Sequence, residues 1–323
     1  MKTQLQGIRC NCGFALDDVV RSGRLNPDSA VGTYAGDGVC YERFAPLFDG
    51  IVGGYHGLTE WVHRSDFDPA HLHHLGTSLA NEPRIRSTRI RVARNLRGMA
   101  FPPAITRDDR LRVEARIVAA LGTLSGDLAG SYTPLSALGD DERRRLVEAH
   151  LLFKQGDRFL EAAGCNRDWP EGRGIYRSAD DGFMVWVNEE DTMRIIAMAP
   201  GGDIVGTFTR LSRAVSALEE RLDFAIDERL GYLSSCPTNL GTAMRASVHV
   251  ELPGLAAAAD GVEQAAAVGL SLRGVHGEHS AAEGGVVDLS NKRRLGVTEA
   301  ECVSTLVKGV FELLERESKV VNS

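Results

Sequence analysis

Residues 231–253, GYLSSCPTNLGTAMRASVHVELP, indicate the fold class because their second half alternates between apolar and polar side chains. The apolar members are Ala246, Val248, Val250 and Leu252, and the polar members between them are Ser247, His249 and Glu251. Successive side chains of a strand point to opposite faces of a sheet, so this period of two predicts a strand with one buried face. The sequence therefore predicts a sheet that is covered on one side.

Other strands and helices are predicted on both sides of this strand along the chain. The apolar runs at 183–187 and 194–198 predict further strands of a covered sheet. Helices are predicted by two capping boxes, Thr106 with Asp109 and Thr298 with Glu301, and by the apolar face of Leu211, Val215 and Leu218. These elements lack the regular strand–helix alternation of a doubly wound sheet, so we expect an α+β fold.

The first 65 residues have a different pattern, with short helices predicted over 15–21 and 41–52. The stretch 66–84 has no clear periodicity and contains Pro69 and Pro83, so it is predicted to be a linker. It also contains His71, His73 and His74. No cysteine or second histidine cluster accompanies them at ligand spacing, so we expect a solvated tract rather than a metal site.

Length and composition exclude several classes of protein. The chain has 323 residues, 43% of them hydrophobic and 25% charged, with a net charge of −7. These values exclude a collagen-like, disordered or disulfide-scaffold protein, and the acidic balance does not favour nucleic-acid binding. No apolar run approaches about 18 residues and the N-terminus lacks an apolar signal region, so we expect a cytoplasmic protein without a membrane span.

The six cysteines are expected to be reduced thiols, as is usual in the cytoplasm. Cys10 and Cys12 form a C-x-C pair, but no matching second pair follows in the sequence, so the signal for a metal site is weak. Cys236 differs from the others because Thr238, Asn239 and Gly241 predict a tight turn with hydrogen-bond donors near its sulfur. Such donors, or a bound cation, would lower the pKa of the thiol, and the alternative is a buried structural cysteine.

Two charged clusters suggest a binding site. Arg89 and Arg91 are two residues apart, so on a strand both guanidinium groups lie on one face and suit a polyphosphate. The consecutive acids Glu189, Glu190 and Asp191 repel one another unless a cation compensates them, so they suit a guanidinium or ammonium group. Taken singly, these clusters also fit a solvated basic strand and a polar hairpin turn.

A glycine-rich segment is the last cluster. Residues 273–285 carry Arg273, Glu278 and His279 among four glycines, which fits either a lid over a ligand or a polar hairpin. The sequence contains neither a P-loop nor a protein-kinase motif. Any phosphate chemistry would therefore use another architecture.

Taken together, these stretches closely resemble the phosphagen (ATP:guanidino) kinases from about Phe14 to the C-terminus. The segments that carry the resemblance are 28–57, STRIRVARNL (87–96), HLLFKQGDRF (150–159), WPEGRGIY (169–176), FMVWVNEED (183–191), 231–253 and 273–299. Within that family the chain most resembles the arginine-specific branch. The resemblance implies a small all-α N-terminal domain and a larger domain with an antiparallel sheet flanked by helices. It places the small domain at 1–65, the linker at 66–84 and the catalytic domain at 85–323.

The resemblance also implies which residues bind the substrates. The ATP site would consist of Arg89, Arg91, His150, Arg194, Arg245, Ala246, Ser247, Val248, His249, Arg273, Gly274, Val275, His276 and Gly277. The guanidino substrate would contact the catalytic residues Glu190, Glu278 and Cys236, and its carboxylate would meet the loop Ser29, Ala30, Val31, Gly32, Thr33 and Tyr34. Glu190 is the expected proton acceptor, and Cys236 would act as a thiolate that orients the guanidinium. Mg²⁺ would enter with ATP or ADP through the phosphates, without protein ligands.

The implied activity is reversible transfer of the γ-phosphoryl group of ATP to L-arginine, in a monomer or homodimer. Glu278 favours arginine because the creatine branch has an apolar residue there. Kinases for other guanidino compounds such as taurocyamine, protein-arginine kinases and a nucleotide-binding homologue with little turnover are the alternatives. Departures from the family pattern are Thr192 in place of histidine, Ala30 in place of glycine, and a short, dissimilar stretch before Phe14.

Overall fold

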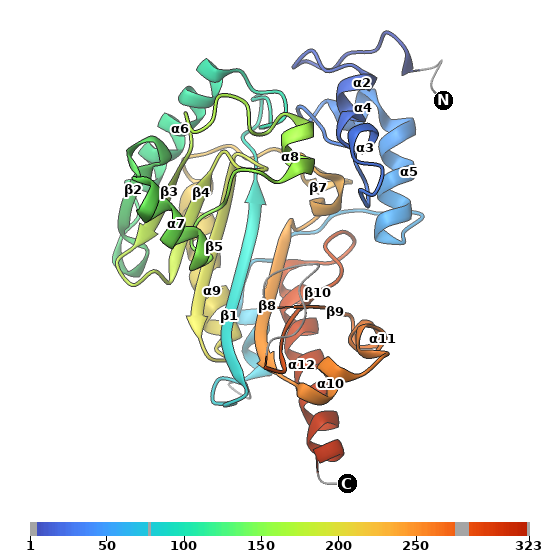
Figure 1. The fold of residues 1–323 in the computed structure, drawn as a ribbon, viewed down its shortest axis with the longest axis vertical. Helices are drawn as coiled ribbons and strands as arrows, with labels where there is room; N and C mark the ends of the chain where they lie inside the picture. The colour runs from blue at the N-terminus through green and yellow to red at the C-terminus, as the bar shows by residue number, and fades with distance from the viewer. Residues whose placement is uncertain (1–4, 77–78, 275–283, 322–323) are drawn as a thin grey trace.

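An eight-stranded sheet organises the larger part of the molecule, as the computed structural model shows for residues 5–76, 79–274 and 284–321 (Figure 1). Its order is β2-β3-β4-β5-β1-β8-β10-β9, and each neighbouring pair is antiparallel. The strands are β1 (Ile85–Arg94), β2 (Gly130–Pro134), β3 (Gly174–Ser178), β4 (Phe183–Val187), β5 (Met193–Pro200), β8 (Met244–Glu251), β9 (Leu270–Gly274) and β10 (Val286–Asn291). The short strands β6 (Ile226–Asp227) and β7 (Gly231–Tyr232) form a separate ribbon.

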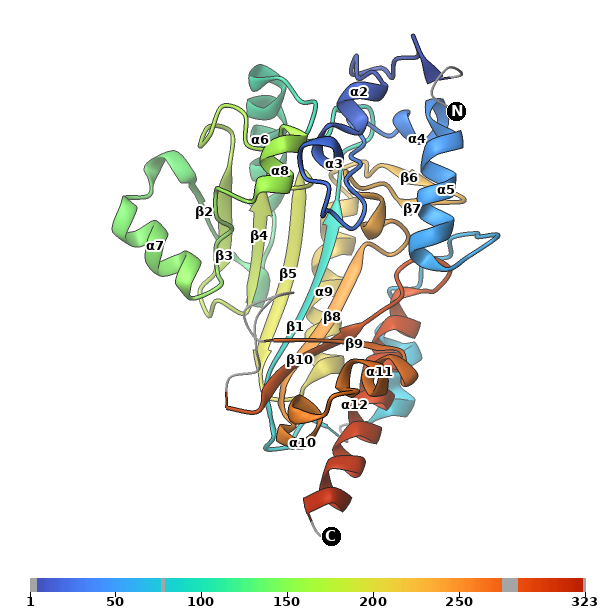
Figure 2. The same cartoon turned by 45° about the vertical axis from the view of Figure 1, so that its right-hand side comes forward.

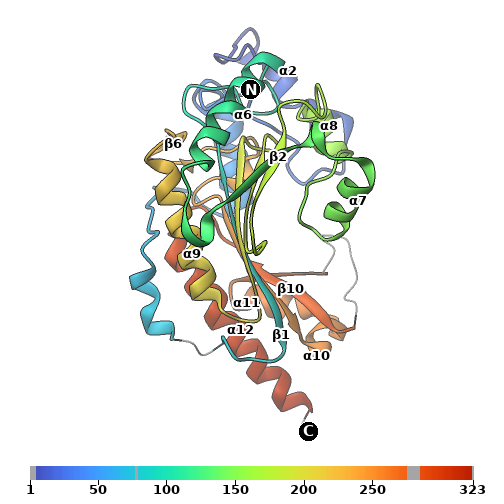
Figure 3. The same cartoon turned by 90° about the vertical axis from the view of Figure 1, so that its left-hand side faces the viewer.

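Helices cover both faces of the sheet. The longer ones in this part are α6 (Arg107–Leu121), α7 (Asp140–Glu148), α9 (Ile204–Glu219) and α12 (Glu299–Val321), with the shorter α8 (Arg158–Ala163), α10 (Pro253–Ala257) and α11 (Gly261–Ala267). Figure 3 shows α9 and α12 on one side of the sheet and α7 on the other. None of the described helices is long and apolar enough to cross a membrane.

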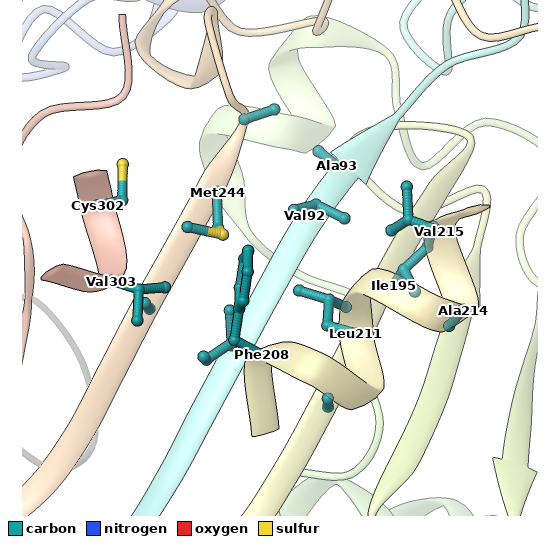
Figure 4. Close-up of a cluster of buried hydrophobic side chains, with 14 of the residues drawn as sticks. Val92, Ala93, Ile195, Phe208, Leu211, Ala214, Val215, Met244, Cys302 and Val303 are labelled. Atoms are coloured by element: carbon teal, nitrogen blue, oxygen red, sulfur yellow. The ribbon is translucent and has the colours of Figure 1, made fainter. Parts of the chain in front are cut away.

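The main core lies between the sheet and the pair α9 and α12. Figure 4 shows Phe208 and Leu211 of α9 beside Val92 of β1, Ile195 of β5 and Met244 of β8. All five side chains are at most 1% exposed. Burial of this apolar surface stabilises the fold and leaves the opposite face of β1, β5 and β8 free to carry polar groups.

The N-terminal part is helical and sits at one end of the sheet (Figure 2). It contains α2 (Leu16–Val19), α3 (Arg21–Leu25), α4 (Cys40–Arg43) and α5 (Ala45–His56). Its own core includes Phe44, Phe48 and Val52, together with Phe101 and Leu240 from the larger part. This shared core attaches the helical part to the end of the sheet.

The stretch expected to be a linker contains a 3₁₀ helix, η1 (Pro69–Leu75), which contacts α9 and α12. Leu72 is 1% exposed and belongs to the main core. His71, by contrast, is exposed and pairs with Asp66 at 2.8 Å. The segment therefore connects the two parts while packing against one of them, and the domain boundaries stay a prediction.

The predicted α+β class is confirmed, with its helical N-terminal part and its antiparallel sheet. The capping box at Thr298 is complete, since Thr298 Oγ1 accepts from the Glu301 N–H at 3.2 Å and Glu301 accepts from the Thr298 N–H at 2.8 Å. At Thr106 only half of the predicted box forms: its hydroxyl accepts from the Asp109 N–H at 3.2 Å, and Asp109 accepts from that hydroxyl at 2.8 Å instead of from the Thr106 N–H. Strands β2, β3, β9 and β10 were not predicted. Their short segments include glycines or polar residues that break the apolar alternation on which the prediction depends.

Candidate active site

The polar face of the sheet forms the floor of a cavity of about 660 Å³. Its lining includes residues of β1, β4, β5, β8, β9 and β10 and of the segment after α7. Seven of the predicted ATP-site residues line it: Arg89, Arg91, His150, Arg245, Ser247, His249 and Arg273. Antiparallel pairing explains the gathering, because Arg89 lies opposite Ser247 and Arg91 lies opposite Arg245 across the β1–β8 ladder.

Arg89 is held at one side of the cavity by Trp186. Its guanidinium carbon is 5.4 Å from the centre of the indole ring, and Nη1 donates to the His150 carbonyl at 3.3 Å. Its Nε and Nη2 are buried without a hydrogen-bond partner. Burial and the charges of Arg194 and Arg245 lower the pKa of Arg89 to about 10. The unused donors therefore suit an anionic ligand.

Arg91 lies at the centre of this positive group. Across residues 5–76, 79–274 and 284–321, it forms no hydrogen bond or ion pair with another side chain. Burial lowers its pKa well below the ordinary value, and Arg194, Arg245 and Arg89 lower it further. Like charges directly across a ladder are destabilising, so the pair Arg91 and Arg245 is a local cost that an anion would remove.

Arg245 is partly neutralised from the neighbouring strand. Its Nη2 donates to Asp288 of β10 at 2.8 Å, and its Nε donates to Ser290 at 3.3 Å. The other oxygen of Asp288 is buried without a partner. This bond fixes the direction of the Arg245 guanidinium and leaves the rest of the group facing the cavity.

Two predicted ATP-site residues point elsewhere. The side chains of Ala246 and Val248 are 0% and 1% exposed and pack in the main core, so only their backbone could reach a ligand in the cavity. Gly274 ends β9 and is buried. Val275, His276, Gly277 and Glu278 lie outside the described residues.

Arg194 joins the cavity to a group of carboxylates. Its guanidinium is 5.6 Å from the ring centre of Trp186, and it pairs with Glu189 at 3.0 Å and Glu190 at 2.8 Å. Burial opposes its charge, but these two carboxylates and Asp191 raise the pKa of Arg194. The predicted compensation of the acidic turn therefore comes first from a residue of the chain itself.

Glu190 is a partly buried carboxyl group with a raised pKa. Burial raises its pKa to about 7, Asp191 and Glu189 contribute in the same direction, and Arg194 opposes the rise. A carboxyl group with a pKa near 7 can accept a proton from a reacting group and can release it again. Glu190 lies in the turn between β4 and β5, next to Arg194 at the edge of the cavity.

Asp191 holds the acidic turn against the segment that carries Cys236. Its carboxylate accepts hydrogen bonds from Ser234 Oγ and the Ser235 N–H, both at 2.7 Å, and from Asn95 Nδ2 at 2.6 Å. Thr192 is fully buried and satisfied, since its N–H donates to Asn95 at 2.8 Å and its hydroxyl donates to the Arg94 carbonyl at 2.9 Å. The departure at Thr192 therefore leaves no unpaired polar group.

Cys236 is 8% exposed and packs with Tyr34, Ala163 and Cys165. The predicted donor is present, because Thr238 Oγ1 lies 3.1 Å from the sulfur. The thiolate was predicted for Cys236 beside the bound guanidinium, and it stays a prediction. Burial and the charge of Glu190 outweigh the hydrogen bond from Thr238 and raise the pKa of Cys236 to about 12. A thiolate here needs a cation beside it.

The loop predicted to bind the substrate carboxylate, residues 29–34, ends beside Cys236 in the fold. Ser29, Ala30 and Val31 are partly or fully exposed, whereas Gly32, Thr33 and Tyr34 are buried. The Ala35 N–H donates to the Ser235 carbonyl at 2.7 Å, which brings Tyr34 beside the sulfur. Ala30 has no left-handed backbone conformation, so its replacement of glycine introduces no strain.

Gly32 does require glycine. Its φ is +63°, and a Cβ there would lie 2.4 Å from the Cα of Gly23. The hydroxyl of Thr33 is buried without a partner. The loop thus approaches α3 closely and presents one unused hydroxyl.

Several residues that organise the site were given no such role from the sequence, although Asp191 was noted as one of three consecutive acids. Trp186 stands between Arg89 and Arg194, Asp288 orients Arg245, and Asp191 ties together two turns 43 residues apart. Arg294 donates to the Thr238 carbonyl at 3.1 Å and so supports the turn after Cys236. Each of these residues lies in or next to a motif that the sequence analysis recognised, and this position was the sign of a possible role. Nothing in the sequence specifies which side chains they contact.

The arrangement therefore combines two chemically different subsites. One is a cavity floored by guanidinium groups, which suits a polyphosphate. In the other, Cys236 packs with Tyr34, and Glu190 lies near them because its neighbour Asp191 bonds to Ser234 and Ser235. This second subsite suits a planar cation, and Arg194 lies between the two.

Comparison with known proteins gives two family matches. The model described as the ATP:guanido phosphotransferase C-terminal catalytic domain matches residues 112–320, and the corresponding N-terminal domain matches residues 1–53. An arginine kinase of Anthopleura japonica is 48% identical over 98% of this chain and 45% of its own length. An arginine kinase of Artemia franciscana is 44% identical over 97% of this chain and 89% of its own length. The chain thus spans about half of the first relative and most of the second.

Two solved structures have the same fold. A duplicated taurocyamine kinase from Schistosoma mansoni with bound transition-state-analogue components aligns with a TM-score of 0.92 and 38% identity, over 98% of this chain and 44% of that chain. A lombricine kinase aligns with a TM-score of 0.92 and 36% identity, over 99% of this chain and 89% of that chain.

The rate at which Cys236 is alkylated should show how the neighbouring charge and hydrogen bond affect the pKa of its thiol. With a pKa of about 12 the thiol should react slowly with iodoacetamide at pH 8, where little thiolate is present. Glu190→Gln should accelerate the reaction several-fold because it removes a nearby negative charge, and Thr238→Val should slow it because it removes a donor. Peptide mass spectrometry of the labelled protein measures both rates. Equal rates in the two variants would refute the assigned causes.

Proposed function

The chain belongs to the ATP:guanido phosphotransferase family, and we propose that it catalyses reversible transfer of the γ-phosphoryl group of ATP to the guanidino group of L-arginine. The observation that carries the proposal is the contact between the two subsites. Arg194 shares the aromatic surface of Trp186 with Arg89 and also pairs with Glu190. A phosphate on one side of Arg194 and a guanidinium on the other would therefore be neighbours.

The phosphate chain of ATP would bind over the floor of the cavity. Arg89, Arg91, Arg245 and Arg273 would share its charge, while His150, Ser247 and His249 line the same space. These groups would neutralise the charge on the phosphoryl oxygens as the bond to the leaving ADP oxygen lengthens. The β1–β8 ladder fixes the backbone of Arg89, Arg91 and Arg245 on one face before a ligand binds, so little further reorganisation is needed when the anion arrives.

Mg²⁺ would enter with the nucleotide. The carboxylates of the lining are committed to arginines: Asp180 to Arg210, Asp181 to Arg177 and Asp288 to Arg245. In the part of the chain that the structure describes, they form no group of three metal ligands. This pattern fits an ion held through phosphate oxygens, where it would neutralise charge.

The guanidino group would displace Arg194 as a partner of Glu190. One nitrogen would attack the γ-phosphorus as the phosphorus–oxygen bond to ADP breaks, and the proton from that nitrogen would pass to Glu190. Cys236 would lie beside the guanidinium, where the added positive charge favours its thiolate. Glu278, from the resemblance, would supply the second carboxylate, and residues 29–34 would receive the substrate carboxylate.

Arginine is the proposed substrate because the relatives that match nearly the whole chain at 42–48% identity are named arginine kinases. Taurocyamine is the second candidate, favoured by the structural likeness to a taurocyamine kinase at 38% identity. The small-domain boundaries, the cytoplasmic location and a monomeric or homodimeric state belong to the same proposal.

A panel of acceptors tests the substrate. With MgATP and purified full-length chain, ADP release should be fast with L-arginine, much slower with taurocyamine and lombricine, and nearly absent with creatine. A coupled ADP assay measures the rates. Faster turnover of taurocyamine than of arginine would overturn the substrate assignment and leave the family intact.

Substitutions at the two subsites should have different kinetic effects. Glu190→Gln should bind MgATP almost normally but lose on the order of 100-fold or more in kcat, because alignment and proton acceptance are both lost. Arg245→Ala should weaken MgATP binding as well as kcat, because its charge acts on the phosphates before and during transfer.

Titration calorimetry with MgATP and steady-state rates separate these effects. Arg86→Ala is the matched control for Arg245→Ala, because it removes a strand arginine that pairs with Glu251, and neither residue lines the cavity. A wild-type kcat in Glu190→Gln would remove that residue from the catalytic role.

A further inference from the structure

Three cysteines and an aspartate form a compact cluster in the N-terminal part, away from the phosphate cavity. The sulfur of Cys10 lies 3.0 Å from that of Cys12 and 2.7 Å from that of Cys40. Asp37 completes the group, and the four ligand atoms all lie within 4.8 Å of one another. In the sequence the pair Cys10 and Cys12 was a weak metal signal because no second pair follows, but folding brings Asp37 and Cys40 to them across separations of 25 to 30 residues.

We propose that Cys10, Cys12, Asp37 and Cys40 bind one Zn²⁺ ion in a closed structural site. Four protein ligands are the usual number in such sites, and thiolate sulfur with one carboxylate oxygen suits Zn²⁺ better than Mg²⁺ or Ca²⁺. Sulfurs bound to one zinc at about 2.3 Å lie roughly 3.7 Å apart. The observed group therefore needs to open by about 1 Å to admit the ion.

The surrounding backbone already orients these ligands. The N–H groups of Cys12 and Cys40 donate to the two oxygens of Asp37, at 2.6 Å and 3.0 Å. The Gly36 N–H points at the sulfur of Cys40 at 3.4 Å. Hydrogen bonds of this kind fix the direction of metal ligands and stabilise their negative charge. The carboxylate keeps free lone pairs for an ion.

Cysteine binds metal as the thiolate, so the three thiols of the cluster would release their protons to the solvent as zinc binds.

The surroundings of the cluster allow the four ligands to lie close together and leave a route by which an ion can reach them. Gly36 is essential there, since a Cβ at that position would lie 2.6 Å from the sulfur of Cys12. On its outer side, Cys12 and Asp37 line a separate cavity of about 690 Å³ beside residues 96–101. An ion can therefore reach the ligands without unfolding of the core.

The proposed ion would connect the N-terminal segment to the start of α4. Cys10 and Cys40 both belong to the core of the N-terminal part, which contains few buried side chains compared with the main core. Asp37 follows Tyr34 by three residues, on the segment whose Ala35 pairs with Ser235. The ion would stabilise the N-terminal part and fix the route of the chain into the Cys236 region.

Metal analysis of the full-length protein tests this proposal. Protein purified under reducing, oxygen-free conditions should contain about one zinc per chain. After removal of zinc, Co²⁺ should bind at one equivalent and give the sulfur-to-metal charge-transfer and ligand-field bands of a tetrahedral thiolate site. Zinc should also raise the melting temperature of the metal-free protein.

Substitutions assign the ligands. Cys40→Ser and Asp37→Asn should each weaken zinc binding, by on the order of 100-fold for the cysteine, and should change the cobalt spectrum. Cys302→Ser is the matched control, because this buried cysteine lies in the main core and should leave both properties unchanged. The wild-type cobalt titration remains decisive if a ligand variant does not fold.

Two results would overturn the proposal. One is the absence of cobalt or zinc binding by the reduced wild-type chain at stoichiometric concentrations. The other is a disulfide between Cys10 and either Cys12 or Cys40 in protein kept under reducing conditions, detected by alkylation and mass spectrometry without added reductant.

Discussion

The structure depends on one electrostatic constraint: arginines of adjacent strands are held on the same face of the sheet without enough acids to neutralise them. The β1–β8 register places Arg91 directly opposite Arg245, and burial together with neighbouring guanidinium groups lowers the pKa values of Arg89 and Arg91. Such an arrangement costs stability in the absence of a ligand. The core on the opposite face, where Phe208 and Val92 pack, supplies the stability that lets the sheet hold these charges in place.

The same balance of charge extends to the second subsite. Arg194 is satisfied by Glu189 and Glu190, while burial and the charge of Glu190 raise the pKa of Cys236. A cationic substrate would change these interactions. It can pair with Glu190, and its positive charge favours the thiolate form of Cys236. Asp191 keeps the two turns together while the charges change, because it bonds to Ser234, Ser235 and Asn95 rather than to a substrate.

The parts of the fold and of the site that depend on residues close together in the sequence could be predicted. The alternation through Ala246 and Val248 identified β8 and its polar face, and the spacing of Arg89 and Arg91 placed both on one side of a strand. The sequence could not show which charges meet across strands, so the pairing of Arg245 with Asp288 and the contact of Trp186 with two arginines were missed. The sequence indicated the donor Thr238 near Cys236, but it could not show the burial that raises the pKa of this thiol to about 12.

The central claim is that the arginine face is held ready for phosphate at a cost to the ligand-free fold. Urea unfolding of Arg91→Met, with and without saturating MgADP, tests it most directly, because the substitution removes the charge at the centre of the group and keeps much of the side-chain volume. The account predicts that this variant is more stable than the wild type without nucleotide and gains much less stability from MgADP. A variant that is less stable without nucleotide, and that MgADP stabilises as strongly as the wild type, would contradict it.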